Sequence, residues 1–412
     1  MRSPSPQAPG RWRAERLVSP PPRGRLIARV LGVHVRVDDP DVIRLREGLV
    51  RVDPVADEFV AWSAGEPQGR GRRLFEAAVE GGLAAVPDAP ECLVRWFEPL
   101  ERAPAWLDRE ALRLACRTSW RTGTDTGLVL SATALMGGYR SSAAVKPLAM
   151  TGALDRMVVR RIAETSRFVL DVLESDTLER RSAGFKSACR VRLMHALVRR
   201  SLTRRADWDW ESWGAPINQT DMAATQLEFS AIYLFGLMVL GYRFTAEERD
   251  AIMHLWRYVG VVMGVDDAIM AHTYAEGRRH MYIHAMTNPP ADEDSRALAR
   301  ALHELPLRLA ETPEARAYAR LQMRYRTAVS RLTLGDEAVD DIGLPAEPLY
   351  PLVALQSVAR FGLETLRRRL PLATERAVQT GRALQRGVIA GLVGDAAVRY
   401  VPYAERSAAS SA

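Results

Sequence analysis

The stretch FKSACRVRLMHALVRRSLTR, residues 185–204, decides the fold. Its apolar residues recur every three or four positions, which is the period of an α-helix with one buried side. One stripe of this helix holds Ala188, Val191, His195, Val198 and Leu202. The imidazole of His195 is therefore aimed at the core between aliphatic side chains.

A histidine in such a wall has two interpretations. It is either a core histidine satisfied by a hydrogen bond or a ligand for a metal or a haem. Spacing alone favours the core interpretation. A single histidine cannot complete a zinc site, which needs three or four protein ligands. It can hold a haem, which needs one proximal ligand.

The preceding helical pattern, GALDRMVVRRIAETSRFVLDVLE at residues 152–174, places two polar residues on an apolar stripe. Arg161 and Thr165 lie one turn apart, and Glu164 lies beside them. They form either a snorkelling arginine with a backbone-bonded threonine or a polar patch on the wall of a dry pocket. Together with His195 they favour a pocket, because haem oxygen chemistry needs a proximal donor facing hydrogen-bonding groups in apolar surroundings.

Helical periodicity dominates the chain after Gly71 and predicts an all-α fold. The expected helices span residues 105–120, 126–136, 153–174, 185–204, 221–240, 246–263, 295–309, 313–332, 352–370 and 374–392. Thr245 and Thr312 are suited to cap two of them, and the Asn-Gln-Thr-Asp run at 218–221 to cap another. We expect a disordered Pro/Arg-rich arm (1–24), a lead-in segment on the core (25–90), one helical domain (91–400) and a flexible tail (401–412). LIARVLGVHVRV, residues 26–37, is either a short strand or a helix or loop.

Composition is that of a soluble globular protein, with 412 residues, 47% hydrophobic and 26% charged. The net charge of +7 comes with 55 arginines and two lysines, which indicates coding bias before any anionic partner. Three scattered cysteines exclude a CxxC zinc or redox motif and suit a reducing compartment. The longest apolar run, residues 229–242, is too short to span a bilayer, and no secretory signal is apparent. We expect a cytoplasmic protein without a transmembrane segment, and leave peripheral membrane contact and oligomeric state open.

RVRLMHALVRR (190–200), followed by GAPINQTDM (214–222), resembles the latex-clearing proteins, or rubber oxygenases, and the wider MpaB-like family of the mycophenolic acid pathway. TGALDRMVVRRIAETSRFV (151–169) and WRYVGVVMGVDDAIM (256–270) extend the similarity. The resemblance implies an all-α fold with a globin-like core around haem b, and O2 as co-substrate. It makes His195 the proximal iron ligand, and Arg192 and Arg199 candidates for the haem propionates.

The resemblance also implies a distal Arg-x-x-Lys-Thr motif, which reads Arg161, Ile162, Ala163, Glu164, Thr165 here. The arginine and threonine match, whereas Glu164 replaces the lysine. No acid stands near positions 145–146, where relatives carry a distal glutamate. We expect Arg161 and Thr165 to polarise bound oxygen and Glu164 to move protons. The expected reaction is cleavage or oxygenation of a C=C bond in a small isoprenoid or another unsaturated lipid.

Other interpretations remain open. A non-catalytic haem sensor or carrier, or a haem-free scaffold of the same family, would fit the loss of the lysine. An isoprenoid synthase would need clustered acids for magnesium, but Asp266-Asp267 and Asp340-Asp341 lack a third acid at the required spacing. Nucleic-acid binding has only the basic run GRGRR at 69–73, without interleaved aromatic residues.

Overall fold

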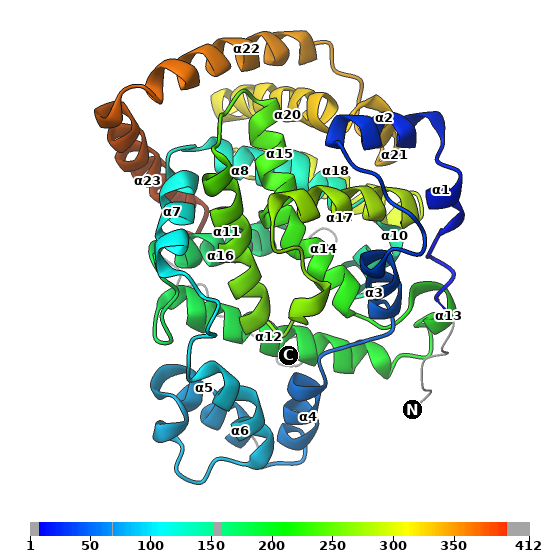
Figure 1. Cartoon of the computed structure of the whole chain (residues 1–412), viewed down its shortest axis with the longest axis vertical. Helices are drawn as coiled ribbons and strands as arrows, with labels where there is room; N and C mark the ends of the chain where they lie inside the picture. The colour runs from blue at the N-terminus through cyan, green and yellow to red at the C-terminus, as the bar shows by residue number, and fades with distance from the viewer. Residues whose placement is uncertain (1–7, 68, 152–157, 394–412) are drawn as a thin grey trace.

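A computed structural model of the chain describes residues 8–67, 69–151 and 158–393. Within these ranges every regular element is helical (Figure 1), which confirms the predicted all-α class. The amino-terminal elements are α1 (Glu15–Val18), α2 (Pro22–Leu31), α3 (Pro40–Gly48), α4 (Pro54–Ser63), α5 (Arg70–Gly81), η1 (Leu83–Ala85), α6 (Glu91–Phe97) and η2 (Glu98–Leu100).

The central elements are α7 (Arg109–Trp120), α8 (Asp125–Val129), the π-helical η3 (Leu130–Leu135), α9 (Met136–Gly138), α10 (Ser142–Met150), α11 (Val158–Glu174), α12 (Ala183–Thr203), α13 (Trp210–Trp213), α14 (Gln219–Phe229), α15 (Ala231–Val239) and α16 (Ala246–Val262). The carboxyl-terminal elements are η4 (Asp267–Ile269), α17 (Tyr274–Thr287), α18 (Glu293–His303), α19 (Leu305–Arg308), α20 (Pro313–Leu334), α21 (Asp336–Asp341), α22 (Tyr350–Arg367) and α23 (Pro371–Val393). The first residues of the helix expected over 153–174 lie outside the described residues.

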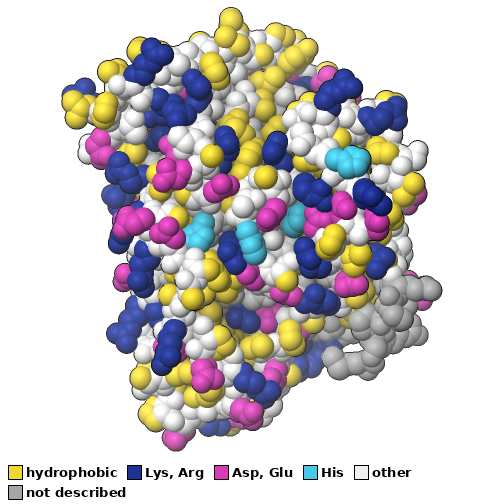
Figure 2. Space-filling view, in the orientation of Figure 1, with side chains coloured by type: hydrophobic (Ala, Val, Ile, Leu, Met, Phe, Trp, Pro, Cys, Tyr) yellow, Lys and Arg dark blue, Asp and Glu magenta, His cyan; other side chains and the backbone are white. Residues whose placement is uncertain are grey.

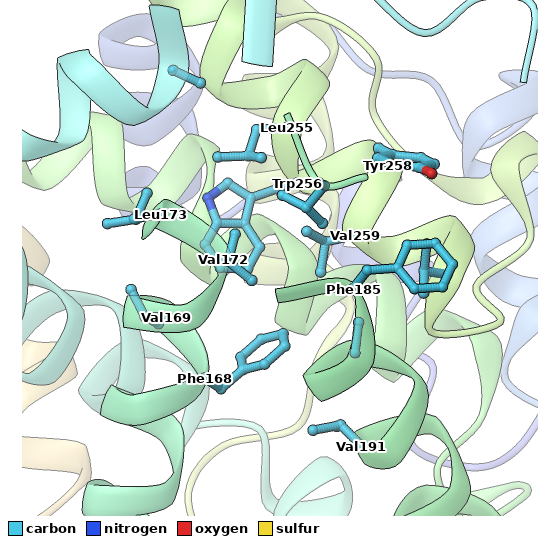
Figure 3. Packing of buried hydrophobic residues seen from close by; sticks show 14 of the residues in the cluster. Phe168, Val169, Val172, Leu173, Phe185, Val191, Leu255, Trp256, Tyr258 and Val259 are labelled. Atoms are coloured by element: carbon cyan, nitrogen blue, oxygen red, sulfur yellow. The ribbon is translucent and has the colours of Figure 1, made fainter. Parts of the chain in front are cut away.

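The centre of the molecule is the hairpin of α11 and α12, against which α16 and α7 pack. The hairpin is tight because a Cβ at Gly184 would lie 2.7 Å from the Cα of Val172. Ser187 Oγ also donates to Asp171 Oδ2 at 2.6 Å across the two helices. Figure 3 shows the core beside the hairpin, where Val169 faces the indole of Trp256 from α16. The apolar stripe predicted for α11 is therefore the side that faces the interior.

Residues 8–24 differ from the expected disordered arm, because they are ordered and attached to the body. Arg11 is buried and donates to both carboxylate oxygens of Asp221, each at 2.8 Å, and to Ser141 Oγ at 3.2 Å. A proline- and arginine-rich composition does not reveal such a partner 210 positions away. The strand alternative for residues 26–37 is wrong, since α2 continues to Leu31 and ends at left-handed Gly32.

Residues 54–97, which include the second half of the expected lead-in segment, form the lower part of the molecule in Figure 1, where α4, α5 and α6 lie together, whereas α2 lies near the top. The aromatic side chains of residues 54–97 make edge-to-face contacts, with ring centroids 5.5 Å apart for Phe59 and Trp96 and 5.3 Å for Phe75 and Trp96. These rings belong to the same buried cluster as the central helices. The segment is therefore continuous with the main core, and α4 packs directly on α12.

The predicted caps are confirmed. Thr245 forms a capping box with Glu248 at α16, Thr312 accepts from Ala315 N at α20, and Asn218 accepts from Asp221 N at α14. The helix expected over 221–240 is divided in two at Ser230. The stretch Gln219–Val239 is long and apolar enough to cross a membrane by length and composition, but half of its most apolar part is buried inside the fold. We interpret it as a core helix pair.

Candidate functional site

His195 lies in the middle of α12, deep in the protein. Burial lowers the pKa of its imidazole to about 4, and the nearby Arg199 acts in the same direction, so the ring is neutral at physiological pH. Nδ1 is buried and has no hydrogen-bond partner within residues 8–67, 69–151 and 158–393. The side chain nevertheless keeps some accessible surface. Because Nδ1 is buried without a partner among the described residues, the interpretation as a hydrogen-bonded core histidine loses its support.

The polar residues predicted on the preceding helix lie on α11. Arg161 donates from its guanidinium to Thr151 Oγ1 at 3.1 Å, and Thr165 lies one turn further along the same stripe. Two turns beyond Arg161, Val169 on that stripe lines a small cavity with Phe229 and Trp256. The stripe therefore faces the interior, as the polar-patch interpretation requires.

Glu164 is buried, and its carboxylate has a cationic partner on its own helix. Arg160 Nε donates to Glu164 Oε1 at 2.8 Å. The sequence did not predict this pair, because Arg160 was one of several arginines around the motif. Its charge neutralises the acid that replaces the family lysine, so the local net charge differs from that of an Arg-x-x-Lys-Thr motif.

The two arginines expected near haem propionates have carboxylate partners within the chain. Arg192 makes a fork with Asp53, with Nε to Oδ2 at 2.7 Å and Nη2 to Oδ1 at 3.0 Å, and both side chains are buried. Arg199 pairs with Asp57 at 2.7 Å and donates to Ile217 O at 3.2 Å. These contacts fix the rotation of α12 against α4, so they orient His195. A propionate role for either arginine stays a prediction.

The structure adds two residues that the sequence analysis did not single out, Tyr139 and Glu228. Glu228 is the last residue but one of α14, lies deep but partly accessible, and its side chain has no hydrogen-bond partner among the residues described. Burial raises the pKa of its carboxyl to about 8. The carboxyl lies against α9, where a Cβ on Gly138 would overlap it. Tyr139 follows directly.

Tyr139 connects Glu228 to α11. Burial raises the pKa of its phenol, the charge of Glu228 raises it further, and the charge of Arg161 lowers it. The phenol thus lies within electrostatic reach of both groups. The sequence held one weak signal for Glu228: it is the single acid immediately before the longest apolar run. Nothing in the sequence linked it to Arg161, 67 positions earlier.

The Asn-Gln-Thr-Asp run is a structural junction beside this site. Gln219 donates to Gly264 O at 3.0 Å and accepts from Asp266 N at 2.8 Å, while Thr220 donates to Leu45 O at 2.5 Å. Asp221 binds Arg11. Four segments far apart in sequence meet at the start of α14, which accounts for the run without a direct chemical role.

The remaining histidines show no metal site. No group of three or more metal-binding side chains occurs in the described part of the chain. His280 and His284 lie one turn apart on α17, and burial lowers their pKa values to about 4 and about 3. His254 Nε2 accepts from Asp108 N at 3.0 Å, so it has an ordinary structural role.

Fold and site together define a class: an all-α protein in which one helix of a central hairpin carries a deep, neutral histidine whose Nδ1 has no partner among the described residues, and the other helix carries the stripe with Arg161 and Thr165. The sequence profile of the family described as ER-bound oxygenase mpaB/B'/Rubber oxygenase, catalytic domain, matches residues 120–368. The chain belongs to this family, as its motifs predicted.

Two relatives show how far the similarity extends. A rubber oxygenase from Streptomyces sp. (strain K30) is 28% identical over 292 residues, which cover 66% of this chain and 64% of that protein. The structure of latex clearing protein LCP in the closed state superposes with a TM-score of 0.56 at 22% identity, covering 85% of this chain and 93% of the other. The second comparison supports the fold.

Proposed function

We propose that this protein is a haem b-dependent oxygenase that uses O2 to cleave or oxygenate a C=C bond in an apolar, isoprenoid-like or other unsaturated lipid substrate. The observation that carries the proposal is His195, a deep imidazole that burial keeps neutral and whose Nδ1 has no hydrogen-bond partner among the described residues. A proximal haem ligand needs these properties, because only the unprotonated nitrogen can bind iron. The residues present therefore fit the cofactor that the family implies.

His195 would hold the haem. Asp53 would keep His195 in position, because it forms a fork with Arg192 one turn earlier on α12. The haem, when bound, supplies the iron at which O2 is activated and the C=C bond is oxidised. Arg161 contributes a fixed positive charge and Thr165 a hydroxyl donor on the opposite helix, both suited to stabilise negative charge that develops on oxygen.

Glu228 is suited to hold the proton that such a reaction needs. With a pKa of about 8 its carboxyl is protonated at neutral pH, and it can donate a proton and take one back with little change in free energy. Glu164 is the second candidate, but its negative charge is balanced by Arg160. We therefore assign proton transfer to Glu228 first and retain Glu164 as a positioning group for Arg161 and Thr165.

The substrate would contact apolar walls. Phe229 and Trp256 stack with ring centroids 4.7 Å apart and, with Val169 and Leu173, line a cavity with room for about one water molecule, so a substrate would have to displace these side chains. Such walls bind hydrocarbon and exclude water from the reacting bond. The three cysteines are free and buried, which suits the cytoplasmic location that we also propose.

The test is the visible absorption spectrum with a pyridine haemochrome assay of the wild type, His195→Ala and, as a matched control, His254→Ala. We expect about one b-type haem per chain in the wild type and the control, and loss or displacement of the Soret band in His195→Ala. A wild type that takes up no haem after reconstitution would overturn the proposal.

Replacement of the lysine by Glu164, paired with Arg160, favours one alternative, a haem sensor or carrier without oxygenase activity. Oxygen uptake with unsaturated isoprenoids separates the two functions. Haem binding with no substrate-dependent oxygen consumption would support the carrier, whereas consumption that depends on His195 would support the oxygenase.

A further inference from the structure

The outer side of α22 and the start of α23 carry an apolar surface that nothing in the described chain covers. Of the eighteen exposed large hydrophobic side chains among the described residues, nine lie within residues 350–372. They are Tyr350, Leu352, Leu355, Val358, Phe361, Leu363, Leu366, Leu370 and Leu372, with exposed fractions from 45% to 77%. Single exposed leucines are ordinary on a protein surface, but a contiguous group of this size marks a binding face. We call these nine residues the α22 face.

Helix α22 carries its large apolar side chains on the side that faces solvent, which is the reverse of the usual arrangement in a surface helix. Its inner side packs on α20 and the body through the buried residues Val353, Ser357 and Glu364. This docking is close, since a Cβ on Gly241 would overlap the carbonyl oxygen of Ser357. The leucines consequently point away from the molecule. Figures 1 and 2 agree: α22 runs along the top edge, and hydrophobic side chains gather there with arginine and lysine side chains nearby.

Charges around the α22 face are mostly positive, since the acid next to Arg376, Glu375, is paired with Arg117. Glu364 is the single acid within residues 350–372, and it is buried on the inner side and paired with Arg367. Arg368, Arg369 and Arg376 are exposed, and their side chains make no hydrogen bond or ion pair within the described ranges. A second copy of this chain placed on the face would bring an apolar surface without acids against these arginines. A surface rich in phosphate groups complements them instead.

We propose that the α22 face is a docking site for an anionic lipid membrane, on which α22 lies parallel to the surface. Its leucines would enter the boundary between headgroups and acyl chains, and Arg368, Arg369 and Arg376 would bind lipid phosphates, as basic amphipathic helices do. This inference stands on surface geometry and does not require the proposed haem chemistry. It would bring an enzyme for a water-insoluble substrate to the phase in which that substrate dissolves.

The experiment is co-sedimentation of the full chain, in the cofactor state in which it is purified, with vesicles of phosphatidylcholine alone or mixed with phosphatidylglycerol. We expect binding to the mixed vesicles that weakens with salt. The double variant Leu355→Gln/Leu363→Gln should lose at least about ten-fold in partitioning, because two apolar side chains no longer enter the bilayer. Arg368→Gln/Arg369→Gln should lose the preference for anionic vesicles.

The matched control is Leu26→Gln/Val30→Gln on α2, which removes two equally exposed apolar side chains outside the face and should leave partitioning unchanged. Thermal unfolding of each variant checks that it is folded, which the exposure of all four positions favours. Equal partitioning of the wild type and the α22 variant would overturn the proposal. The proposal would also be overturned if the wild type does not bind vesicles and light scattering shows a dimer that the Leu355→Gln/Leu363→Gln variant does not form.

Discussion

Replacing Glu228 by glutamine is expected to stabilise the protein at neutral pH while it impairs the proposed chemistry. Burial raises the pKa of this carboxyl from 4.5 to about 8. An acid whose pKa is higher in the folded than in the unfolded state binds a proton on folding, so the free energy of unfolding falls as pH rises from about 4.5 to about 8. Glutamine keeps the shape and has no proton to lose.

The magnitude follows from the size of the shift. One pKa unit corresponds to about 1.4 kcal/mol, so Glu228 lowers the free energy of unfolding by about 1 kcal/mol near pH 5 and by about 3 kcal/mol near pH 7. The fixed cost of burying the glutamine amide is the same at both pH values. The advantage of Glu228→Gln over the wild type should therefore grow by about 2 kcal/mol between them.

Urea unfolding of both proteins across this pH range, in the same cofactor state, measures the difference. Glu91→Gln is the control, because the side chain of Glu91 is 84% exposed and its replacement removes a carboxylate outside the interior. If the difference between Glu228→Gln and the wild type does not change with pH, the pKa of Glu228 is the same in the folded and the unfolded protein, and the reasoning that makes it a proton donor is refuted. An acid that is kept for a site at a cost in stability is expected to show such a pH-dependent difference in the free energy of unfolding.

Three further outcomes are expected. Asp53→Ala should lower the free energy of unfolding by about 4 kcal/mol, because it leaves Arg192 buried without its partner, and adding Arg192→Met should recover part of the loss in a double-mutant cycle. Gly381→Ala should cost about 2 kcal/mol in urea unfolding, since its Cβ would overlap a backbone oxygen at the end of α7, whereas Gly387→Ala, with open space around it, should cost nothing. Thr245→Ala should cost about 1 kcal/mol through the lost capping box of α16, and Thr245→Ser should restore the stability.

Local patterns in the sequence were sufficient for much of the fold. The stripe through His195 and the stripe through Arg161 and Thr165 have the period of a helix, so each predicted its own buried side without knowledge of its neighbours. The caps were equally local, since a threonine and the amide three residues later are enough to define one. The family motif then supplied the proposed role of His195 as a haem ligand, which the stripe alone left open.

Pairings between distant segments could not be predicted in this way. Arg192 was one of 55 arginines, and no periodicity connects it to Asp53 or distinguishes it from a solvated neighbour. Glu228 and Tyr139 are 89 positions apart, and their proximity depends on how α14 meets α9. The pair of Arg160 and Glu164 is local in sequence, but it could not be predicted either, because other arginines on the same helix are alternative partners for the carboxylate. Partner choice is decided by tertiary packing.

The bond between Arg11 and Asp221 also has a meaning for synthesis in the cell. A ribosome adds roughly 5 to 20 residues per second, so Arg11 is made at least about 10 seconds before the carboxylate that it binds. During that interval the nascent amino-terminal segment has no place to dock, because the start of α14 and the segment with Gly264 and Asp266 have not been made. Translation speed and chaperones that cover this segment would therefore influence the yield of folded protein more than its equilibrium stability suggests.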